Sequence, residues 1–211
     1  MARSRADDYD DKRRAILDRS SQLFSEHGYD RASMSKIAKA CGVSKANLYH
    51  YYVDKEELLF DVIRLHLETL LGVVEAADCP DISPELRLRE LVVALLEAYR
   101  DADFKHNVQI TSMRFLPPER QAELKGMERE LVRIFSDAVR GVAPQLEGTK
   151  MLKPVTMSLF GMVNWHYLWF KSAGPFSRTD YAELVTTLVS DGTRNLSGQR
   201  LSKSKRITAA E

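Results

Sequence analysis

Apolar residues recur along most of the chain at the three- and four-residue intervals of an amphipathic α-helix. No segment shows the two-residue alternation of a half-buried β-strand, so the pattern predicts an all-α protein of about nine helices. The expected helices cover residues 10–27, two short stretches within 33–52, then 54–77, 83 onward, 104–113, 119–142, 151–171 and 177 onward. The buried positions expected on these helices include Leu86, Leu91, Leu124, Met127, Tyr181, Leu184, Val185, Leu188 and Val189.

Residues 33–55 carry the most specific pattern of the chain, two short helices around a glycine turn. Ser33 or Ser35 can cap the first helix, because a serine oxygen accepts a hydrogen bond from an unpaired N–H of the first turn. Gly42 ends this helix, since glycine takes the left-handed conformation without a Cβ clash. Ser44 then caps the second helix. A helix-turn-helix of this size is typical of proteins that read DNA in the major groove.

The second short helix is expected to show most of its polar side chains to solvent. Leu48 and Tyr52 are four residues apart and face inward, which leaves amine, amide and phenol groups outside. Lys45 and Asn47 are expected at base edges or nearby phosphates, since lysine suits guanine acceptors and asparagine can pair with adenine. His50 either packs or touches a phosphate. Residues expected to contact the DNA backbone, which adds affinity without sequence information, are Ser33, Ser35, Tyr49, Tyr51 and Lys55. The whole set expected to meet DNA is Ser33, Ser35, Lys45, Ala46, Asn47, Tyr49, His50, Tyr51 and Lys55.

Over roughly residues 12–60, the chain resembles the TetR family of bacterial one-component repressors. The family usually has Ala, Gly and Phe where this chain has Cys41, Ala46 and Tyr52. The resemblance implies a three-helix DNA-binding head, a C-terminal helical bundle and a homodimer, and Lys55 matches the family's phosphate-contacting lysine. The matching residues are Ile16, Leu23-Phe24, Gly28-Tyr29, Ser33, Ile37-Ala38, Gly42-Val43-Ser44, Leu48-Tyr49, Tyr51-Tyr52 and Lys55-Glu56-Glu57-Leu58-Leu59.

Three domains or segments are expected from the pattern and the resemblance together. Residues 1–55 would be the DNA-binding domain with an N-terminal arm, and residues 56–198 the ligand-binding and dimerisation domain. Residues 199–211 are polar and basic and are expected to form a disordered tail.

The first nine residues have no apolar period and are expected to form a mobile arm. Arg3 and Arg5 of this arm would either reach DNA phosphates or belong to a frayed terminus. Lys12 and Arg13 or Arg14, near the start of the first helix, are unfavourable for the helix dipole. They are therefore interpreted either as contacts for an external phosphate or as a solvated face.

The helices expected over residues 151–171 and 177 onward carry more apolar surface than one small domain can cover. Two copies could join these helices into a four-helix bundle about a two-fold axis, and a purely intramolecular core is the alternative. In the dimer, the two recognition helices would enter successive major grooves about 34–36 Å apart. The partner would then be a double-stranded, pseudo-palindromic operator.

Aromatic residues concentrate near the end of the 151–171 helix, where a ligand site is expected. An amide and flat apolar side chains fall there on one stripe, although core packing or dimer burial would use the same tryptophans. Residues 115–135 and 159–175 resemble the TetR branch whose effectors are coenzyme A thioesters of fatty acid, sterol-ring or phenylacetate breakdown. Arg114, His106 or Lys171 would then meet phosphates or carbonyls, or be ordinary surface charges. The expected ligand-binding residues are Phe104, Arg114, Phe115, Phe135, Phe160, Asn164, Trp165, Leu168 and Trp169.

The 211-residue composition, with 44% hydrophobic and 29% charged residues, is that of a soluble globular protein. No apolar run of about 18 residues and no signal peptide is present, so a cytoplasmic protein without membrane contact is expected. Cys41 and Cys79 are expected to be free thiols. Residues 1–55 carry 11 Lys and Arg against 8 Asp and Glu, an asymmetry that agrees with DNA binding.

An enzyme and a structural helical bundle are the two other classes of protein to which the chain could belong. No metal-ligand spacing, phosphate-binding glycine loop or nucleophile elbow occurs, so no catalysis, metal or cofactor is expected. A structural bundle would explain the amphipathic helices but not the exposed Lys45, Asn47 and Tyr49 beside Lys55. Among regulators, a repressor released by an acyl- or aryl-CoA is expected, and an efflux or stress regulator that senses a free hydrophobic compound is the alternative.

Overall fold

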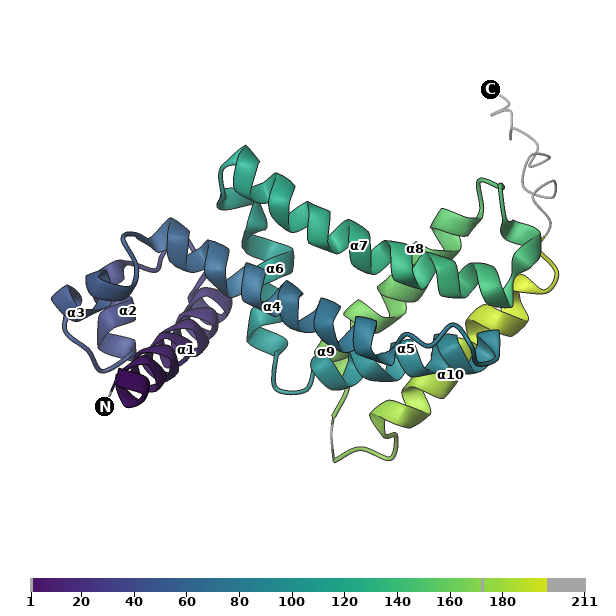
Figure 1. Ribbon diagram of the computed structural model, residues 1–211, viewed down its shortest axis with the longest axis horizontal. Coiled ribbons are helices and arrows are strands. Elements are labelled where there is room, and N and C mark those ends of the chain that lie inside the picture. The colour runs from purple at the N-terminus through teal and green to yellow at the C-terminus, as the bar shows by residue number, and fades with distance from the viewer. Residues whose placement is uncertain (1, 172, 197–211) are drawn as a thin grey trace, which may run out of the picture. The chain divides into compact units, whose positions relative to one another are not determined.

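The computed structural model describes residues 2–171 and 173–196, and every regular element in this part of the chain is helical (Figure 1). This confirms the all-α prediction. The predicted tail at 199–211 lies outside the described residues. The helices are α1 (Ala2–His27), α2 (Met34–Ala40), α3 (Lys45–Tyr51), α4 (Lys55–Ala77), α5 (Pro84–Ala98), α6 (Asp103–Ser112), α7 (Pro118–Val142), α8 (Leu152–Asn164), α9 (His166–Trp169) and α10 (Arg178–Thr193), with 3₁₀ turns at Met113–Phe115 and Pro144–Leu146.

The chain forms two compact units, and α4 and α7 each contribute to both. The head unit contains the chain up to Gly72 together with Ala98–Arg129, and the bundle unit contains Val73–Glu97 and the chain from Glu130. The head unit therefore includes α6 as well as α1–α3. The predicted division at residue 55 concerns function and stays a prediction.

Helices α1–α4 of the head unit (Figure 1) contribute buried apolar side chains to its core. Contacts between α1 and α6 extend this unit: the Ser25 hydroxyl donates to the Asn107 side-chain oxygen at 3.1 Å, and Lys105 pairs with Asp18 at 2.7 Å. These polar contacts hold α6 against the same helix that supports α2 and α3. The core side chains, each at most 2% exposed, include Ile16, Phe24, Ile37, Leu48, Tyr52, Leu58 and Leu59.

Helix α1 begins at Ala2, so the expected helix start at about residue 10 is wrong and residues 2–9 are helical. The expected mobility of the arm stays a prediction. No proline or glycine interrupts the chain before Gly28, and Lys12 pairs with Asp8 one turn earlier at 2.7 Å. The side chains at residues 8–12 are exposed, so this part of the helix needs no apolar stripe. The missing apolar period therefore did not indicate a missing helix.

The helix expected over residues 151–171 is interrupted, which corrects the sequence interpretation. α8 ends at Asn164, Trp165 links it to the single turn α9, and Phe170 is extended. The break allows the ring of His166 to pack 4.1 Å from Phe170 and 5.5 Å from Tyr181. Asn164, Trp165, Leu168 and Trp169 therefore do not share one helical stripe.

Three expected core leucines are in fact exposed. Leu86 is 43% exposed, and Leu88 takes the buried place on α5. Leu184 and Leu188 are 44% and 53% exposed, because α10 buries the neighbouring face formed by Ala182, Val185 and Val189. Met127 is half-buried. The predicted helical spacing of apolar residues on α10 is therefore correct. The buried face runs through Val185 and Val189 rather than through Leu184 and Leu188.

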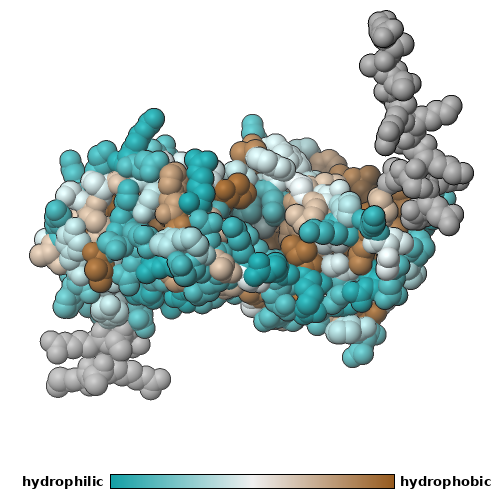
Figure 2. All heavy atoms as spheres, turned by 90° about the horizontal axis from the view of Figure 1, so that it is seen from above, coloured by the Kyte–Doolittle hydropathy of each residue, from teal (hydrophilic) through white to brown (hydrophobic). Residues whose placement is uncertain are grey.

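The surface in Figure 2 is mostly hydrophilic, with hydrophobic residues in separate patches. Among the described helices, none has both the length and the apolar character that a bilayer crossing requires. Both cysteines are free, Cys41 half-buried and Cys79 exposed, and burial raises the pKa of the Cys41 thiol.

Candidate DNA-binding surface and ligand-binding residues

The turn between α2 and α3 is built by the local signals that the sequence contains. The Ser33 hydroxyl accepts a hydrogen bond from the Lys36 N–H at 3.3 Å, and Ser44 accepts one from Asn47 at 3.0 Å. Gly42 has a φ of 67°, the left-handed conformation that ends α2. The two predicted N-caps and the glycine stop are confirmed.

The outward face of α3 is exposed as predicted. Leu48 and Tyr52 are 0% and 1% exposed and anchor the helix in the head core. Lys45 and Asn47 are exposed, and Tyr49 is 44% exposed. The Lys45 ammonium lies 5.8 Å from the centre of the Tyr49 ring, so an amine and a phenol occupy the same surface. This face has the shape and chemistry of a major-groove reader.

The remaining residues predicted to meet DNA differ in their surroundings. Ser33, Ser35, Ala46 and His50 are exposed. Tyr51, the last residue of α3, is half-buried because its ring stacks on that of Tyr9 in α1, with centroids 4.7 Å apart. Nothing in the sequence pattern indicated this stack, since the two residues are far apart along the chain and neither lies on an expected apolar stripe.

Lys55 has an intramolecular role that the sequence did not reveal. Its ammonium donates to the carbonyl oxygens of Tyr29 at 2.9 Å and Ala32 at 3.0 Å, and it lies 4.0 Å from the centre of the Tyr29 ring. Two of its three N–H donors are thus used to tie the first turn of α4 to the α1–α2 loop. A phosphate contact by Lys55 stays a prediction, and it would use the remaining donor.

Arg13, interpreted from sequence as a phosphate contact or a solvated side chain, is instead paired with Asp61 of α4. Asp61 also accepts from Arg64 at 3.1 Å, and its side chain is only 10% exposed. The Arg13 guanidinium lies 5.7 Å from the centre of the Tyr52 ring. Through Arg13, α1 therefore contacts both α4 and Tyr52, the residue that follows α3.

The residues predicted to bind ligand belong to both compact units, and each group is described within its own unit. In the head unit, Phe104 and Arg114 are exposed, and Phe115 stacks on Tyr29 with centroids 5.2 Å apart. In the bundle unit, Phe135 and Phe160 are buried and meet edge to face at 5.0 Å.

The predicted ligand-binding residues around the end of α8 lie at the surface of the single chain. Asn164 is half-buried, whereas Trp165, Leu168 and Trp169 are exposed. A cavity of ≈ 590 Å³ does exist in the head unit between α1, α4 and the start of α6, but it contains none of the predicted residues. It is lined by Leu17, Val62, Leu65 and His66 together with charged side chains. Ligand binding by the predicted set stays a prediction.

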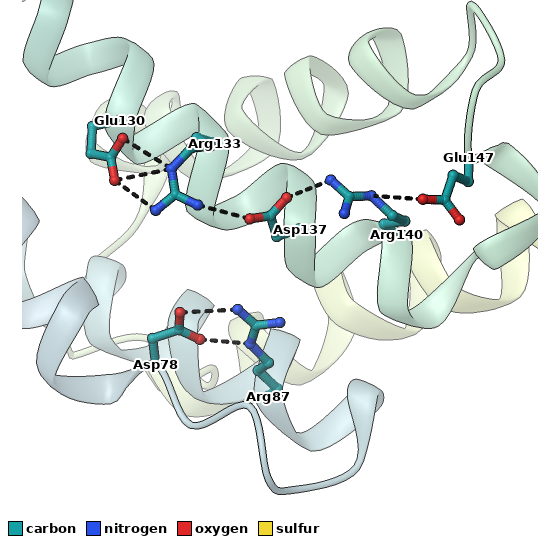
Figure 3. A network of polar contacts seen from close by, with 7 residues as sticks. All are labelled: Asp78, Arg87, Glu130, Arg133, Asp137, Arg140 and Glu147. Atoms are coloured by element: carbon teal, nitrogen blue, oxygen red, sulfur yellow. Dashed lines mark hydrogen bonds and ion pairs between the residues drawn. The ribbon is translucent and has the colours of Figure 1, made fainter.

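The bundle unit carries a line of ion pairs along α7, shown in Figure 3. Arg133 joins Glu130 at 2.7 Å to Asp137 at 2.9 Å, and Arg140 continues from Asp137 toward Glu147. These pairs are largely exposed, and each contributes little stability.

A second ion pair in Figure 3 has a clearer structural role. Arg87 makes a two-pronged contact with Asp78 at 2.6 and 2.9 Å, with both side chains mostly buried, and so joins α5 to the end of α4. In the described part of the chain, no cluster of three or more His, Cys, Asp or Glu residues could hold a metal ion.

A capped helix-turn-helix with an exposed amine, amide and phenol surface, followed by a helical bundle, defines a helix-turn-helix transcription regulator. The chain belongs to the tetR family of bacterial regulatory proteins. Residues 16–62 match the family model "Bacterial regulatory proteins, tetR family", and residues 81–193 match "Tetracyclin repressor-like, C-terminal domain". The membership makes the protein a transcription regulator rather than an enzyme.

Solved structures show the same fold over most of the chain. A TetR-family regulator from Bordetella parapertussis 12822 is 34% identical with a TM-score of 0.80, over 87% of this chain and 96% of that one. AibR, solved "in complex with isovaleryl coenzyme A and operator DNA", is 26% identical with a TM-score of 0.72, over 84% of this chain and 97% of that one.

Several curated relatives match over shorter lengths. The regulator RutR of Escherichia coli strain K12 is 34% identical over 90 residues, which is 43% of this chain and 42% of RutR. The first matched relatives are covered over only 33% and 42% of their own lengths.

Proposed function

We propose that the protein is a ligand-responsive repressor that binds a pseudo-palindromic operator as a homodimer and is released by a small hydrophobic effector. The observation that carries the proposal is the exposed face of α3, where Lys45, Asn47 and Tyr49 project beyond a buried Leu48–Tyr52 anchor. Such a short helix gains nothing for the core from these side chains, but it presents them in the manner of a recognition helix. A DNA-binding role of this kind belongs in the bacterial cytoplasm.

The first test is whether the purified protein retards DNA from upstream of its own operon in a salt titration. We expect saturable, sequence-dependent binding whose affinity falls steeply with salt, because neutralised phosphates release counterions. Binding to this DNA no tighter than to a shuffled sequence of equal length would contradict the proposal.

Asn47→Ala and Lys55→Ala are expected to weaken DNA binding in different ways. Asn47→Ala should reduce discrimination against single-base changes by roughly 5- to 100-fold at one operator position, because a base-edge contact is lost. Lys55→Ala should weaken all sequences alike, because it frees the start of α4 from the carbonyls of Tyr29 and Ala32. Quantitative binding to a panel of operator variants separates the two effects.

The salt dependence of the Lys55→Ala protein then assigns the role of this residue. If Lys55 also contacts a phosphate, the slope of log affinity against log salt should fall by about 1. If Lys55 only positions the helix, the slope should be unchanged. Identical behaviour of the two variants in both measurements would show that the division of roles is wrong.

The dimer is supported by the apolar side chains left exposed on α8 and α10. Met157 of α8 and Leu184 and Leu188 of α10 are all exposed, and α8 and α10 contact each other in the bundle unit. Exposed apolar residues that form one patch on a protein surface commonly mark a site of interaction with another protein. A second copy of the same two helices would cover them in a symmetric four-helix arrangement.

A coenzyme A thioester is the effector class that we propose first, and AibR, whose complex contains isovaleryl coenzyme A, supports it. We propose that the Phe135–Phe160 pair, which is buried in the bundle unit, would form one apolar wall of the site for the acyl or aryl group. Such an effector acts only if it binds the DNA-free conformation more tightly than the DNA-bound one.

We expect acyl- or aryl-CoA compounds to release the protein from its DNA in a retardation assay, whereas free coenzyme A should not. The panel should contain short-chain, long-chain and aryl thioesters, with the matching free acids and a set of uncharged hydrophobic compounds. Release by the uncharged compounds alone would favour the alternative, a regulator of an efflux or stress operon. The same wall of Phe135 and Phe160 supports that alternative, since it carries no charge.

A further inference from the structure

α1 begins well before the first residue that matches the family model. The family model begins at residue 16, whereas α1 begins at Ala2. Within this extension, Tyr9 places its ring against Tyr51 with the two planes 25° apart. This stack joins the start of the first helix to the last residue of α3.

The Tyr9–Tyr51 stack is one of two neighbouring contacts that α1 makes with the end of α3, and the two α1 residues are one helical turn apart. Tyr9 and Arg13 are four residues apart on α1 and therefore lie on the same face. Tyr9 stacks on Tyr51, and Arg13 lies over the next residue, Tyr52, while pairing with Asp61. Lys12 lies close enough to Tyr51 for the phenol to contribute to raising the pKa of Lys12, after the larger effect of its hydrogen bond and ion pair with Asp8.

α3 needs such support because it is only seven residues long. A helix of two turns is not stable by itself in water, so its orientation is set by the few side chains that anchor it. Leu48 is the only buried residue within α3. Tyr52, the residue that follows α3, is also buried and gives the helix a second anchor. The ring of Tyr51 adds a further link between the last turn of α3 and the rest of the head, through its stack on Tyr9.

We propose that Tyr9 is a positioning residue for DNA reading, which holds Tyr51 and the last turn of α3 in the orientation that fits the operator. Tyr9 acts through Tyr51 and does not itself contact a base. At 41% exposed, Tyr9 contributes little to the core, so its ring serves the orientation of α3 more than folding. The inference rests on the proposed DNA-binding function.

The test compares Tyr9→Ala with Tyr9→Phe in the full-length protein, on DNA that the unmodified protein selects from a randomised pool. Alanine keeps α1 helical but removes the ring, so affinity should fall about 3- to 10-fold per head, or about 10- to 100-fold for a dimer. Phenylalanine keeps the stack, so it should bind within about twofold of the original protein. The salt slope should stay unchanged in both variants, because no phosphate contact is lost.

A structural measurement separates positioning from direct contact. The Tyr52 N–H donates to the Leu48 carbonyl at 3.1 Å and closes the last turn of α3, so its hydrogen exchange should accelerate in Tyr9→Ala without DNA. Tyr51→Ala should cause the same loss of affinity, and adding Tyr9→Ala to it should cause no more.

Three outcomes would overturn the inference. Tyr9→Ala could bind like the original protein, Tyr9→Phe could be as weak as Tyr9→Ala, or the Tyr9 and Tyr51 effects could simply add. The second outcome would indicate a direct hydroxyl contact with DNA. Failure of the original protein to select any DNA would instead contradict the proposed function, so the two failures are distinguishable.

Discussion

Replacing Leu184 and Leu188 together by glutamate is expected to convert the proposed dimer to a monomer and to weaken operator binding at least about 100-fold. Both leucines are exposed on α10 in the single chain, at 44% and 53%, so the charges cost little in the monomer. Across a symmetric interface, each glutamate would be buried without a partner and would face its own copy. A monomer then loses the gain from binding two half-sites at once.

Leu86→Glu is the matched control for this prediction. Leu86 is 43% exposed on α5, in the same compact unit, and receives the same substitution. Light scattering coupled to size-exclusion chromatography should show a dimer for Leu86→Glu and a monomer for the α10 double variant. If the double variant remains a dimer with full DNA affinity, the subunits associate through a different surface.

The fluorescence of the two tryptophans of the chain gives an independent test of the proposed dimer interface of α8 and α10. Trp165 and Trp169 are both exposed in the single chain and lie between α8 and α10. If a second copy covers them, dissociation should shift their fluorescence to longer wavelength and increase quenching by acrylamide. Equal quenching in the dimer and in the monomeric variant would place the tryptophans outside the interface.

The free energy of unfolding is expected to fall as the pH is lowered from about 6.5 toward 3, and His66 should be a main cause. His66 is 3% exposed between α4 and α6, and burial lowers its pKa to about 3, with His106 and Lys105 adding to the effect. The unfolded chain takes up a proton near the ordinary histidine pKa of about 6.5, whereas the folded chain stays neutral.

The sign of the pH effect follows from these two pKa values. Above about 6.5 neither state is protonated at His66, and its full contribution to stability is present. Between about 6.5 and 3 only the unfolded state binds the proton, so stability is lost by an amount on the order of 4 kcal/mol. Burial also lowers the pKa of His166 to about 4, with Arg178 adding, and this acts in the same direction.

Urea unfolding at several pH values tests the contribution of His66. His66→Leu removes the titrating ring from a buried site and should flatten the dependence between about pH 6.5 and 4. His27→Leu, at an exposed histidine of α1, should leave the dependence unchanged. An unaltered pH dependence in His66→Leu would mean that other groups account for the acid sensitivity.

Much of the head could be predicted from local sequence because local signals form it. Ser33, Gly42 and Ser44 act within three or four residues of themselves, through first-turn N–H groups and a left-handed turn. Leu48 and Tyr52 are one helical turn apart, so periodicity alone places both on the inner side. The exposed Lys45 and Asn47 follow from the same geometry.

The contacts that were missed join residues far apart in the chain. Lys55 donates to Tyr29 and Ala32, 26 and 23 residues earlier, and Arg13 pairs with Asp61, 48 residues later. An ammonium or guanidinium group on a predicted outer face can meet either solvent, DNA or a distant part of its own chain. Local pattern does not distinguish these partners.

The last helices show the same limit for apolar surfaces. Helical period predicted apolar stripes on α8 and α10, yet α8 ends at Asn164, and Leu184 and Leu188 are exposed on α10. Periodicity determines which residues share a face of one helix, because it depends only on the backbone repeat. Which face meets a neighbouring helix depends on how all the helices pack, and that emerges only when the whole chain has folded.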